Sequence, residues 1–116
     1  MLKRILALAI GLLMATTAHA MKGDEFAQLL DAWTRINTKQ STTREDELSA
    51  SAFTGYVRGV EDSMNGVRFC IPPKATSAQQ VAFIAKYVKG HPEELHNAAT
   101  TLIVQALQPA YPCEGQ

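Results

Sequence analysis

The chain has 116 residues, of which 11 are basic and 11 acidic, so it has no formal net charge at pH 7. Nucleic-acid binding relies on a basic patch that neutralises phosphates, and this charge balance therefore argues against a nucleic-acid partner. A chain of this length forms one domain with a modest core and would benefit from a covalent crosslink.

Residues 1–20 have the pattern of an export signal. Lys3 and Arg4 give a basic start, an apolar run follows, and a small-x-small cleavage pattern ends at Ala20. The apolar run is shorter than the roughly 20 residues that span a bilayer. We expect cleavage after Ala20, and the periplasm of a Gram-negative bacterium is the favoured destination of residues 21–116. This product carries 9 basic and 11 acidic side chains and has no later segment apolar enough to anchor it in a membrane.

Cys70 and Cys113 are the two cysteines of the chain. Export would place them in an oxidising compartment, where an even number of cysteines indicates a disulfide. Neither belongs to a Cys-x-x-Cys redox motif, and no histidine stands at metal-ligand spacing from either of them. We predict a Cys70–Cys113 disulfide, whose loop of roughly 40 residues should add about 4 kcal/mol to the free energy of unfolding.

The first predicted helix covers residues 23–36. Its apolar residues recur every three or four positions, and Asp24 and Glu25 lie in the first turn, where the helix dipole favours acidic groups. The apolar face consists of Phe26, Leu29, Leu30, Trp33 and Ile36. A polar loop over residues 37–44 follows and ends in two possible capping boxes, Thr42-x-x-Glu45 and Thr43-x-x-Asp46.

The central helix of the predicted fold contains residues 53–64. One of its faces is bulky and apolar, and a second face carries small residues that include Gly55 and Gly59. Glycine within a helix costs about 0.5–1 kcal/mol relative to alanine, so close approach of another backbone would have to offset that cost. We interpret Gly55, Tyr56 and Gly59 as helix-packing residues of a soluble bundle. The alternative is a seam between two copies of the chain in a homodimer.

After Gly66 the chain is predicted to leave the helical conformation, because Pro72-Pro73 presets an extended segment. A capping box at Thr76-x-x-Gln79, or alternatively at Ser77-x-x-Gln80, then restarts a helix. Gly90 is expected to end this helix.

The last predicted helix begins at Pro92 and ends at Pro109. Its apolar stripe consists of Leu95, Ala99, Leu102, Ile103 and Ala106. The tail then returns to bring Cys113 to Cys70. With no strand-like alternation and no internal repeat, the sequence predicts an all-α, single-domain bundle of about four helices closed by one disulfide.

Candidate groups for catalysis or metal binding are few. His91 and His96 are five residues apart, which is about 140° around a helix, so they do not form a two-ligand metal face. We expect His96 to pack against the core and His91 to lie in an exposed turn. Glu93 and Glu94 are expected in the first turn of a helix, where the helix dipole favours acidic side chains. The other adjacent acid pairs are expected on solvent-exposed faces of helices. With no nucleophile elbow, phosphate-binding loop or calcium loop, we predict no catalytic residues, metal or cofactor.

An ordered set of residues from position 53 onward resembles a known family. The set comprises Phe53-x-Gly55-Tyr56-x-x-Gly59-Val60-x-Asp62, Phe69-Cys70-x-Pro72, Gln80, Tyr87, His91-Pro92, Ala106-Leu107 and Pro112-Cys113. In order and spacing, and together with the export signal, it resembles the Rap/Tai family of type VI secretion amidase immunity proteins.

This resemblance implies a small all-helical periplasmic protein, often a homodimer, that neutralises a papain-like cysteine amidase acting on peptidoglycan. The inhibition would be steric, and a rigid plug binds tightly because it loses little conformational freedom on docking. One candidate plug is the turn that contains Lys89, His91, Glu93 and Glu94, which are the candidate partner-binding residues. The other is the 65–76 loop.

Two other functions, neither of them catalytic, fit the same sequence. A small periplasmic acid-stress chaperone would also be helical and held by one disulfide, and it would have to expose apolar surface at low pH. A structural adaptor subunit of an envelope assembly is the third alternative.

Overall fold

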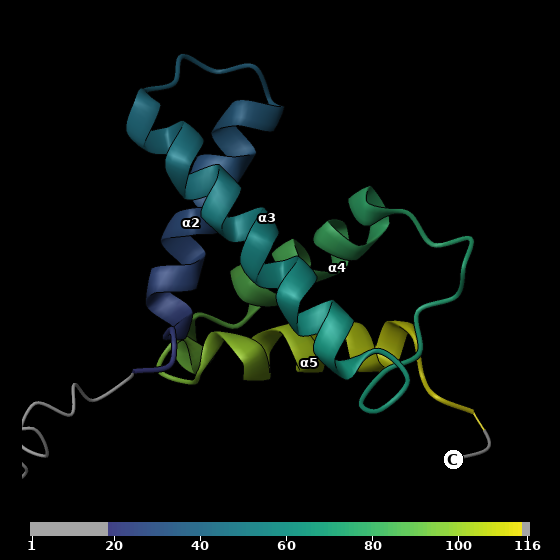
Figure 1. Cartoon of the computed structure of the whole chain (residues 1–116). Coiled ribbons are helices and arrows are strands. Elements are labelled where there is room, and N and C mark those ends of the chain that lie inside the picture. The colour runs from purple at the N-terminus through teal and green to yellow at the C-terminus, as the bar shows by residue number, and fades with distance from the viewer. Residues whose placement is uncertain (1–18, 115–116) are drawn as a thin grey trace, which may run out of the picture.

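The computed structural model describes residues 19–114, and these form four α-helices and one short 3-10 helix (Figure 1). The elements are α2 (Gly23–Asn37), α3 (Arg44–Met64), α4 (Ser77–Gly90), η1 (Pro92–Glu94) and α5 (Ala99–Ala110). No strand occurs within residues 19–114, which confirms the predicted all-α fold. The expected export signal lies outside the described residues except for His19 and Ala20. None of the described helices is long and apolar enough to cross a membrane.

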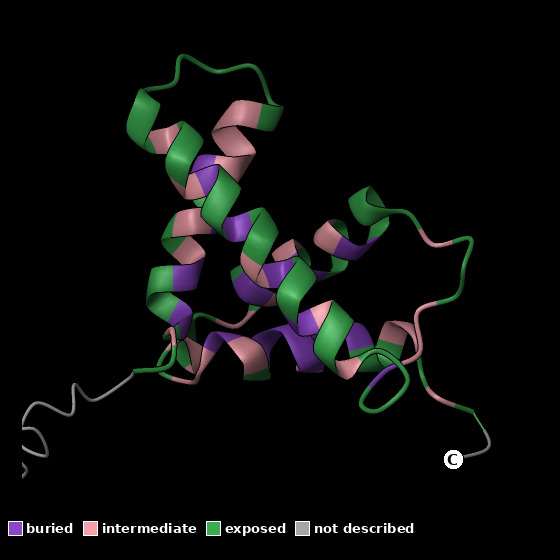
Figure 2. Ribbon diagram, viewed as in Figure 1, coloured by how far each residue is buried: buried purple, intermediate pink, exposed green. Residues whose placement is uncertain are grey.

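The four helices form two consecutive pairs. α2 packs against α3, α4 packs against α5, and α5 also contacts both helices of the first pair (Figure 1). Three side chains of α5, Leu102, Ile103 and Leu107, are completely buried, whereas α3 is exposed along its outer face (Figure 2). The most enclosed helix is therefore α5, and the prediction that residues 53–64 form the central helix is wrong in this respect.

Aromatic side chains join α2 to α3. The ring of Phe53 stacks on Phe26 at a centroid distance of 5.1 Å and lies 5.7 Å from Trp33. The apolar periodicity of both helices is thus confirmed, because these positions face one another across the pair. The fully buried core also contains Leu30, Phe69, Ile84, Leu102, Ile103 and Leu107.

Gly55 and Gly59 do not pack against another element of the described chain. Both are exposed, and a Cβ atom placed on either would meet nothing within 4 Å. Tyr56 does pack, since its ring lies 5.9 Å from that of Phe26 and its hydroxyl is 2.8 Å from Thr100 Oγ1. The prediction of a packed glycine face within one chain is therefore wrong, and the homodimer seam stays a prediction.

A close backbone approach occurs instead at Gly23, the first residue of α2. A Cβ atom there would lie 2.7 Å from the carbonyl oxygen of Leu95 and 2.7 Å from a methyl group of Leu102. The amides of Gly23 and Asp24 donate to the carbonyl oxygens of Asn97 and Leu95, at 2.7 and 3.0 Å. The segment before α5 thus satisfies two amides that a helix start leaves without intrahelical partners.

These contacts explain why the last helix starts later than predicted. Pro92 opens only the 3-10 turn η1, and α5 begins at Ala99 because the carbonyls of residues 95 and 97 serve the start of α2. A helix running through residues 95–98 would turn those carbonyls toward its own amides. The predicted end of this helix was Pro109, and in the structure α5 includes Pro109 and ends one residue later, at Ala110.

Two of the predicted capping boxes are confirmed. Thr43 caps α3 with Asp46, and Thr76 caps α4 with Gln79, whereas the alternatives that start at Thr42 and Ser77 do not form the caps. Asp46 also accepts a hydrogen bond from Arg35. This bond, together with the backbone amide of Thr43, holds the pKa of Asp46 below its ordinary value.

The substitution Asp46→Asn should lower the melting temperature at neutral pH. Because the pKa of Asp46 is lower in the folded state than its ordinary value of 3.8, the ionised carboxylate stabilises the fold above that pH. This contribution is lost as the pH falls through the folded pKa, so the difference from the unsubstituted protein should shrink on acidification. Circular-dichroism melts over a pH series measure it, with Glu45→Gln in the same helical turn as control. A difference independent of pH would contradict the assignment.

Replacing Gly55 by alanine should stabilise the protein by about 0.5–1 kcal/mol, because the helix loses a flexible residue and nothing obstructs the added methyl group. Gly23→Ala should be destabilising, because its methyl group would collide with the Leu95 backbone. Urea denaturation of both variants measures these changes. If Gly55→Ala destabilised the protein or altered its sedimentation, a second copy of the chain would cover this face.

Candidate functional site

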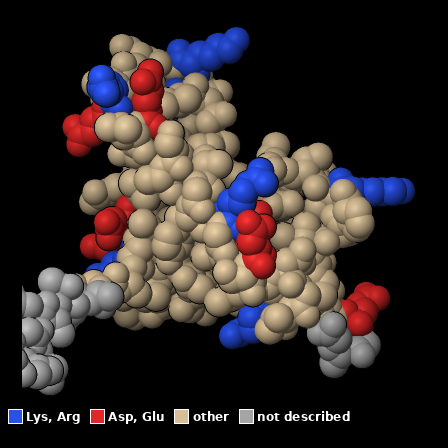
Figure 3. Space-filling model, in the orientation of Figure 1, with Lys and Arg blue, Asp and Glu red and all other residues tan. Residues whose placement is uncertain are grey.

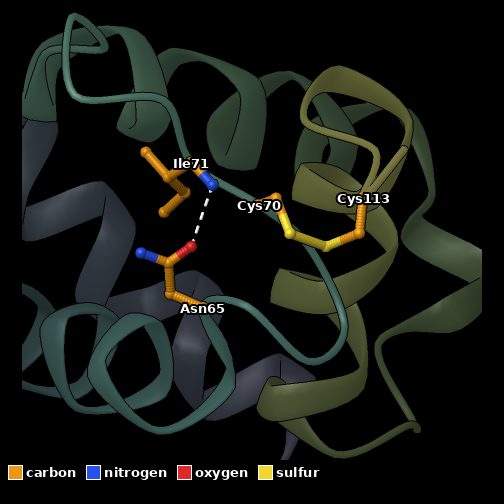
Figure 4. The surroundings of a disulfide bond; sticks show 4 residues. All are labelled: Asn65, Cys70, Ile71 and Cys113. Atoms are coloured by element: carbon orange, nitrogen blue, oxygen red, sulfur yellow. Dashed lines mark hydrogen bonds between the residues drawn. A yellow bond between two sulfur atoms is a disulfide. The ribbon is translucent and has the colours of Figure 1, made fainter. Parts of the chain in front are cut away.

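A disulfide joins Cys70 to Cys113, as predicted (Figure 4). The two Cα atoms are 4.9 Å apart, within the usual range for this crosslink. A backbone hydrogen bond of 2.8 Å from the Cys70 amide to the Tyr111 carbonyl oxygen lies beside it. The segment that follows α3 is thereby attached to the segment that follows α5.

The crosslink forms the base of a short loop, residues 65–71, which we call the tethered loop. Gly66 adopts a φ of +87°, and its amide donates to the Phe69 carbonyl oxygen at 2.7 Å. The side-chain oxygen of Asn65 accepts from the Ile71 amide at 2.9 Å, across the base of the loop (Figure 4). Phe69 is completely buried. The loop is therefore held from both ends and by a buried aromatic ring.

The tip of the tethered loop is apolar and open to solvent. Val67 is 72% exposed, the largest value among the exposed large apolar side chains, which also include Leu48 at 64% and Phe83 at 42%. Arg68, next to Val67, is also exposed. The amides of Val67 and Arg68 both donate to the Met64 carbonyl oxygen at 3.0 Å, which fixes the tip on the end of α3.

Phe83 on α4 contacts Tyr111, which lies two residues before Cys113. Its ring meets that of Tyr111 edge-on at a centroid distance of 5.6 Å. A shallow groove beside this pair is also lined by Pro72 and Lys74. Phe83, which is 42% exposed, thus adds an exposed apolar group next to the residues that follow Cys70.

The second predicted contact region, which we call the 89–94 turn, is organised by Tyr87. The ring of His91 stacks on that of Tyr87 at 4.0 Å, and His91 Nδ1 lies 2.8 Å from the Tyr87 carbonyl oxygen. The Tyr87 hydroxyl donates to Glu94, and burial together with this bond raises the pKa of Tyr87 to about 12. Glu93 and Lys89 are exposed.

Three of the four candidate residues of this turn come together. A ring nitrogen of His91 and carboxylate oxygens of Glu93 and Glu94 lie within 4.8 Å of one another. His91 was expected in an exposed turn and is half-buried, and Glu93 and Glu94, expected at the start of a long helix, lie in the short turn η1. His96, which was expected to pack against the core, is exposed because α5 begins only at Ala99.

The tethered loop and the 89–94 turn lie toward opposite ends of α5 (Figure 1). The Cys70 amide binds the Tyr111 carbonyl just after α5, whereas the turn precedes this helix. A helix of 12 residues is about 18 Å long, so the two regions are separate surfaces. A narrow cleft in a partner protein can accept one of them.

A groove between α2, α3 and α4 was not predicted. It has a volume of about 210 Å³ and is lined by residues that include Trp33, Arg58, Glu61 and Gln80. With its amide nitrogen facing Glu61, the buried Gln80 donates to both carboxylate oxygens, at 2.6 and 2.9 Å. Partial burial raises the pKa of Glu61 above its ordinary value, and the nearby positive charge of Arg58 acts in the opposite direction. Gln80 is one of the residues that carry the resemblance to the Rap/Tai family. Its place in that set was the feature of the sequence that pointed to this position.

On the face shown in Figure 3, basic and acidic side chains are scattered among uncharged ones. This face does not present a field of one sign that would steer a strongly charged partner. Shape and apolar contact are therefore the features of this face that can select a partner.

Breaking the disulfide should lower the free energy of unfolding by about 4 kcal/mol, which corresponds to roughly 15 °C or more in melting temperature. The reason is that the sequence separation of 43 residues between the cysteines makes the closed loop long. Thermal melts with and without reductant measure this, and the double variant Cys70→Ala/Cys113→Ala should not respond to reductant. An unchanged melting temperature on complete reduction would exclude a structural role.

Comparison with known proteins gives one family. A family model described as Rap1a immunity proteins matches residues 22–113. This range contains both cysteines and the four α-helices of the part of the chain that the structure describes. No match was found among curated proteins.

Proposed function

Because the chain belongs to the Rap1a immunity protein family, we propose that it is a periplasmic immunity protein that sterically blocks a type VI secretion peptidoglycan amidase. The resemblance identified from the residues between 53 and 113 is confirmed by the family match. An immunity protein acts by binding a partner effector and performs no catalysis in that role. Membership of this family favours the immunity role over an acid-stress chaperone or an envelope adaptor.

The observation that carries the steric mechanism is the tethered loop with its exposed tip. The active site of a papain-like amidase is a cleft, and a convex loop can fill a cleft without a chemical reaction. Val67 offers an apolar side chain at the tip, and complete burial of a valine contributes about 1.5–3 kcal/mol. Arg68 beside it is of the residue type that is enriched in binding hot spots.

The rigidity of the loop supports the same assignment. Its amides at Gly66, Val67 and Arg68 are hydrogen-bonded, and Phe69 anchors it in the core. A loop that is already ordered loses little conformational entropy when it binds. The 89–94 turn is also ordered, but its exposed groups Lys89 and Glu93 are both charged, whereas the tip of the tethered loop carries the exposed apolar side chain of Val67 beside its one charged residue, Arg68.

The proposed compartment agrees with the chemistry of the crosslink. A disulfide persists in an oxidising compartment, and residues 1–20 have the pattern of an export signal. Peptidoglycan is the substrate of the proposed effector and lies in the periplasm, so inhibitor and effector would meet there. We expect a cysteine amidase effector to be encoded next to this protein.

The substitution Val67→Asp should weaken binding to that amidase by at least about 100-fold, because it would bury an unpaired carboxylate in the cleft. Calorimetric titration measures the dissociation constant, and survival of cells that secrete the amidase into their periplasm measures protection. The matched control is Leu48→Asp, which makes the same change at another exposed apolar residue on α3. The control should bind and protect like the unsubstituted protein.

The charge-reversal variants Lys89→Glu and Glu93→Lys identify the competing contact. If they abolish binding and Val67→Asp does not, the 89–94 turn is the inhibitory element and the tethered loop is not. If the unsubstituted protein neither binds the adjacent amidase nor protects cells, the proposed target is wrong.

A further inference from the structure

We infer that the 89–94 turn is a binding site for a divalent transition-metal ion such as Zn²⁺, held by His91, Glu93 and Glu94. This inference goes beyond the proposed function, which places the effector contact on the tethered loop at the other end of α5. It does not depend on the identity of the effector.

The distances among the three ligand atoms are close to those that a zinc ion requires. One ring nitrogen and two carboxylate oxygens lie within 4.8 Å of one another. Zinc binds nitrogen and oxygen at about 2.0–2.2 Å in tetrahedral geometry, so two ligands of one ion are about 3.3 Å apart. Binding would therefore require the side chains of Glu93 and Glu94 to rotate and bring the ligand atoms closer together.

The hydrogen bond of His91 decides which of its ring nitrogens is available to a metal ion. Its Nδ1 lies 2.8 Å from the Tyr87 carbonyl oxygen, and a carbonyl oxygen can only accept a hydrogen bond. Nδ1 therefore carries the proton of the neutral ring, and the lone pair that a metal needs is on Nε2. Ligating histidines in proteins commonly donate their second ring nitrogen to a backbone carbonyl in this way. Stacking on Tyr87 at 4.0 Å also fixes the plane of the ring.

Tyr87 orients a second ligand as well. Its hydroxyl donates to one oxygen of Glu94, and the other oxygen of that carboxylate remains available. The same hydroxyl is 2.8 Å from the side chain of Gln105 on α5, which ties this arrangement to the most buried helix. One tyrosine thus positions two of the three ligands, which is the role that outer-shell partners play in metal sites.

The donor set selects the type of metal. Imidazole with carboxylates suits zinc and other late first-row ions, whereas calcium and magnesium prefer oxygen ligands alone. Two carboxylates would neutralise the charge of a dication. Three protein ligands leave a fourth position, which water or a donor from another molecule fills.

The test is a calorimetric titration of ZnCl₂ into residues 21–116, purified with the disulfide intact and without a histidine tag. We expect one zinc ion per chain. His91→Ala should weaken zinc affinity at least tenfold because it removes a ligand. Tyr87→Phe keeps the ring but removes the hydroxyl, and should weaken affinity about tenfold or more.

The matched control is His96→Ala, which removes the other histidine of this region. His96 is exposed, and its Nδ1 lies 2.9 Å from the Glu93 carbonyl oxygen, but it is outside the three-ligand group. This variant should bind zinc like the unsubstituted protein, and MgCl₂ should give no binding. Circular dichroism verifies that each variant is folded.

The absence of zinc binding by the unsubstituted protein would overturn the inference. Equal affinity in His91→Ala, or a loss in His96→Ala as large as that in His91→Ala, would also overturn it. Loss of binding in both His91→Ala and Tyr87→Phe, with retention in His96→Ala, would support it.

Discussion

The Cys70–Cys113 disulfide is the constraint on which the shape of the tethered loop depends. It attaches the segment after α3 to the segment after α5, and the Cys70–Tyr111 hydrogen bond and the buried ring of Phe69 reinforce the same junction. With its base fixed in this way, the tethered loop can expose Val67 to solvent without losing its shape. Membership of the immunity family implies binding to a partner effector, and the tethered loop is the surface that we propose enters the cleft of that effector.

The rest of the fold is organised around α5 and not around the disulfide. α5 is the most buried helix, and the segment before it supplies the carbonyls that satisfy the start of α2 at Gly23 and Asp24. The loop after α3 and the turn before α5 are thus held by different contacts at opposite ends of one helix. Effector binding at the tethered loop and metal binding at the 89–94 turn, both proposed here, would not compete for the same residues.

Local signals in the sequence were sufficient for most of the fold. Apolar periodicity located the four α-helices of residues 19–114, and the Thr43 and Thr76 patterns located two caps. The even cysteine count, in a chain with the pattern of an export signal, indicated the disulfide. The failures concern contacts between distant segments. A small-residue stripe at Gly55 and Gly59 does not reveal whether anything covers it, and the start of α5 depends on carbonyls that serve α2.

The candidate site was predicted in part for the same reason. The 65–76 loop, which contains the tethered loop, and the 89–94 turn were both predicted as candidate contact regions, and that role stays a prediction. The proximity of His91, Glu93 and Glu94 was not predicted, because it depends on a 3-10 turn that helical spacing does not describe. The contact between Glu61 and Gln80 joins two helices, and neither helix has a local pattern that predicts it; only the occurrence of Gln80 in the family pattern marked this position.

The most direct test of the proposed mechanism is a crystal structure of the complex with the adjacent amidase. We expect the tethered loop to lie in the active-site cleft, with Val67 out of contact with solvent. A complex in which this loop stays exposed and another surface covers the cleft would contradict it.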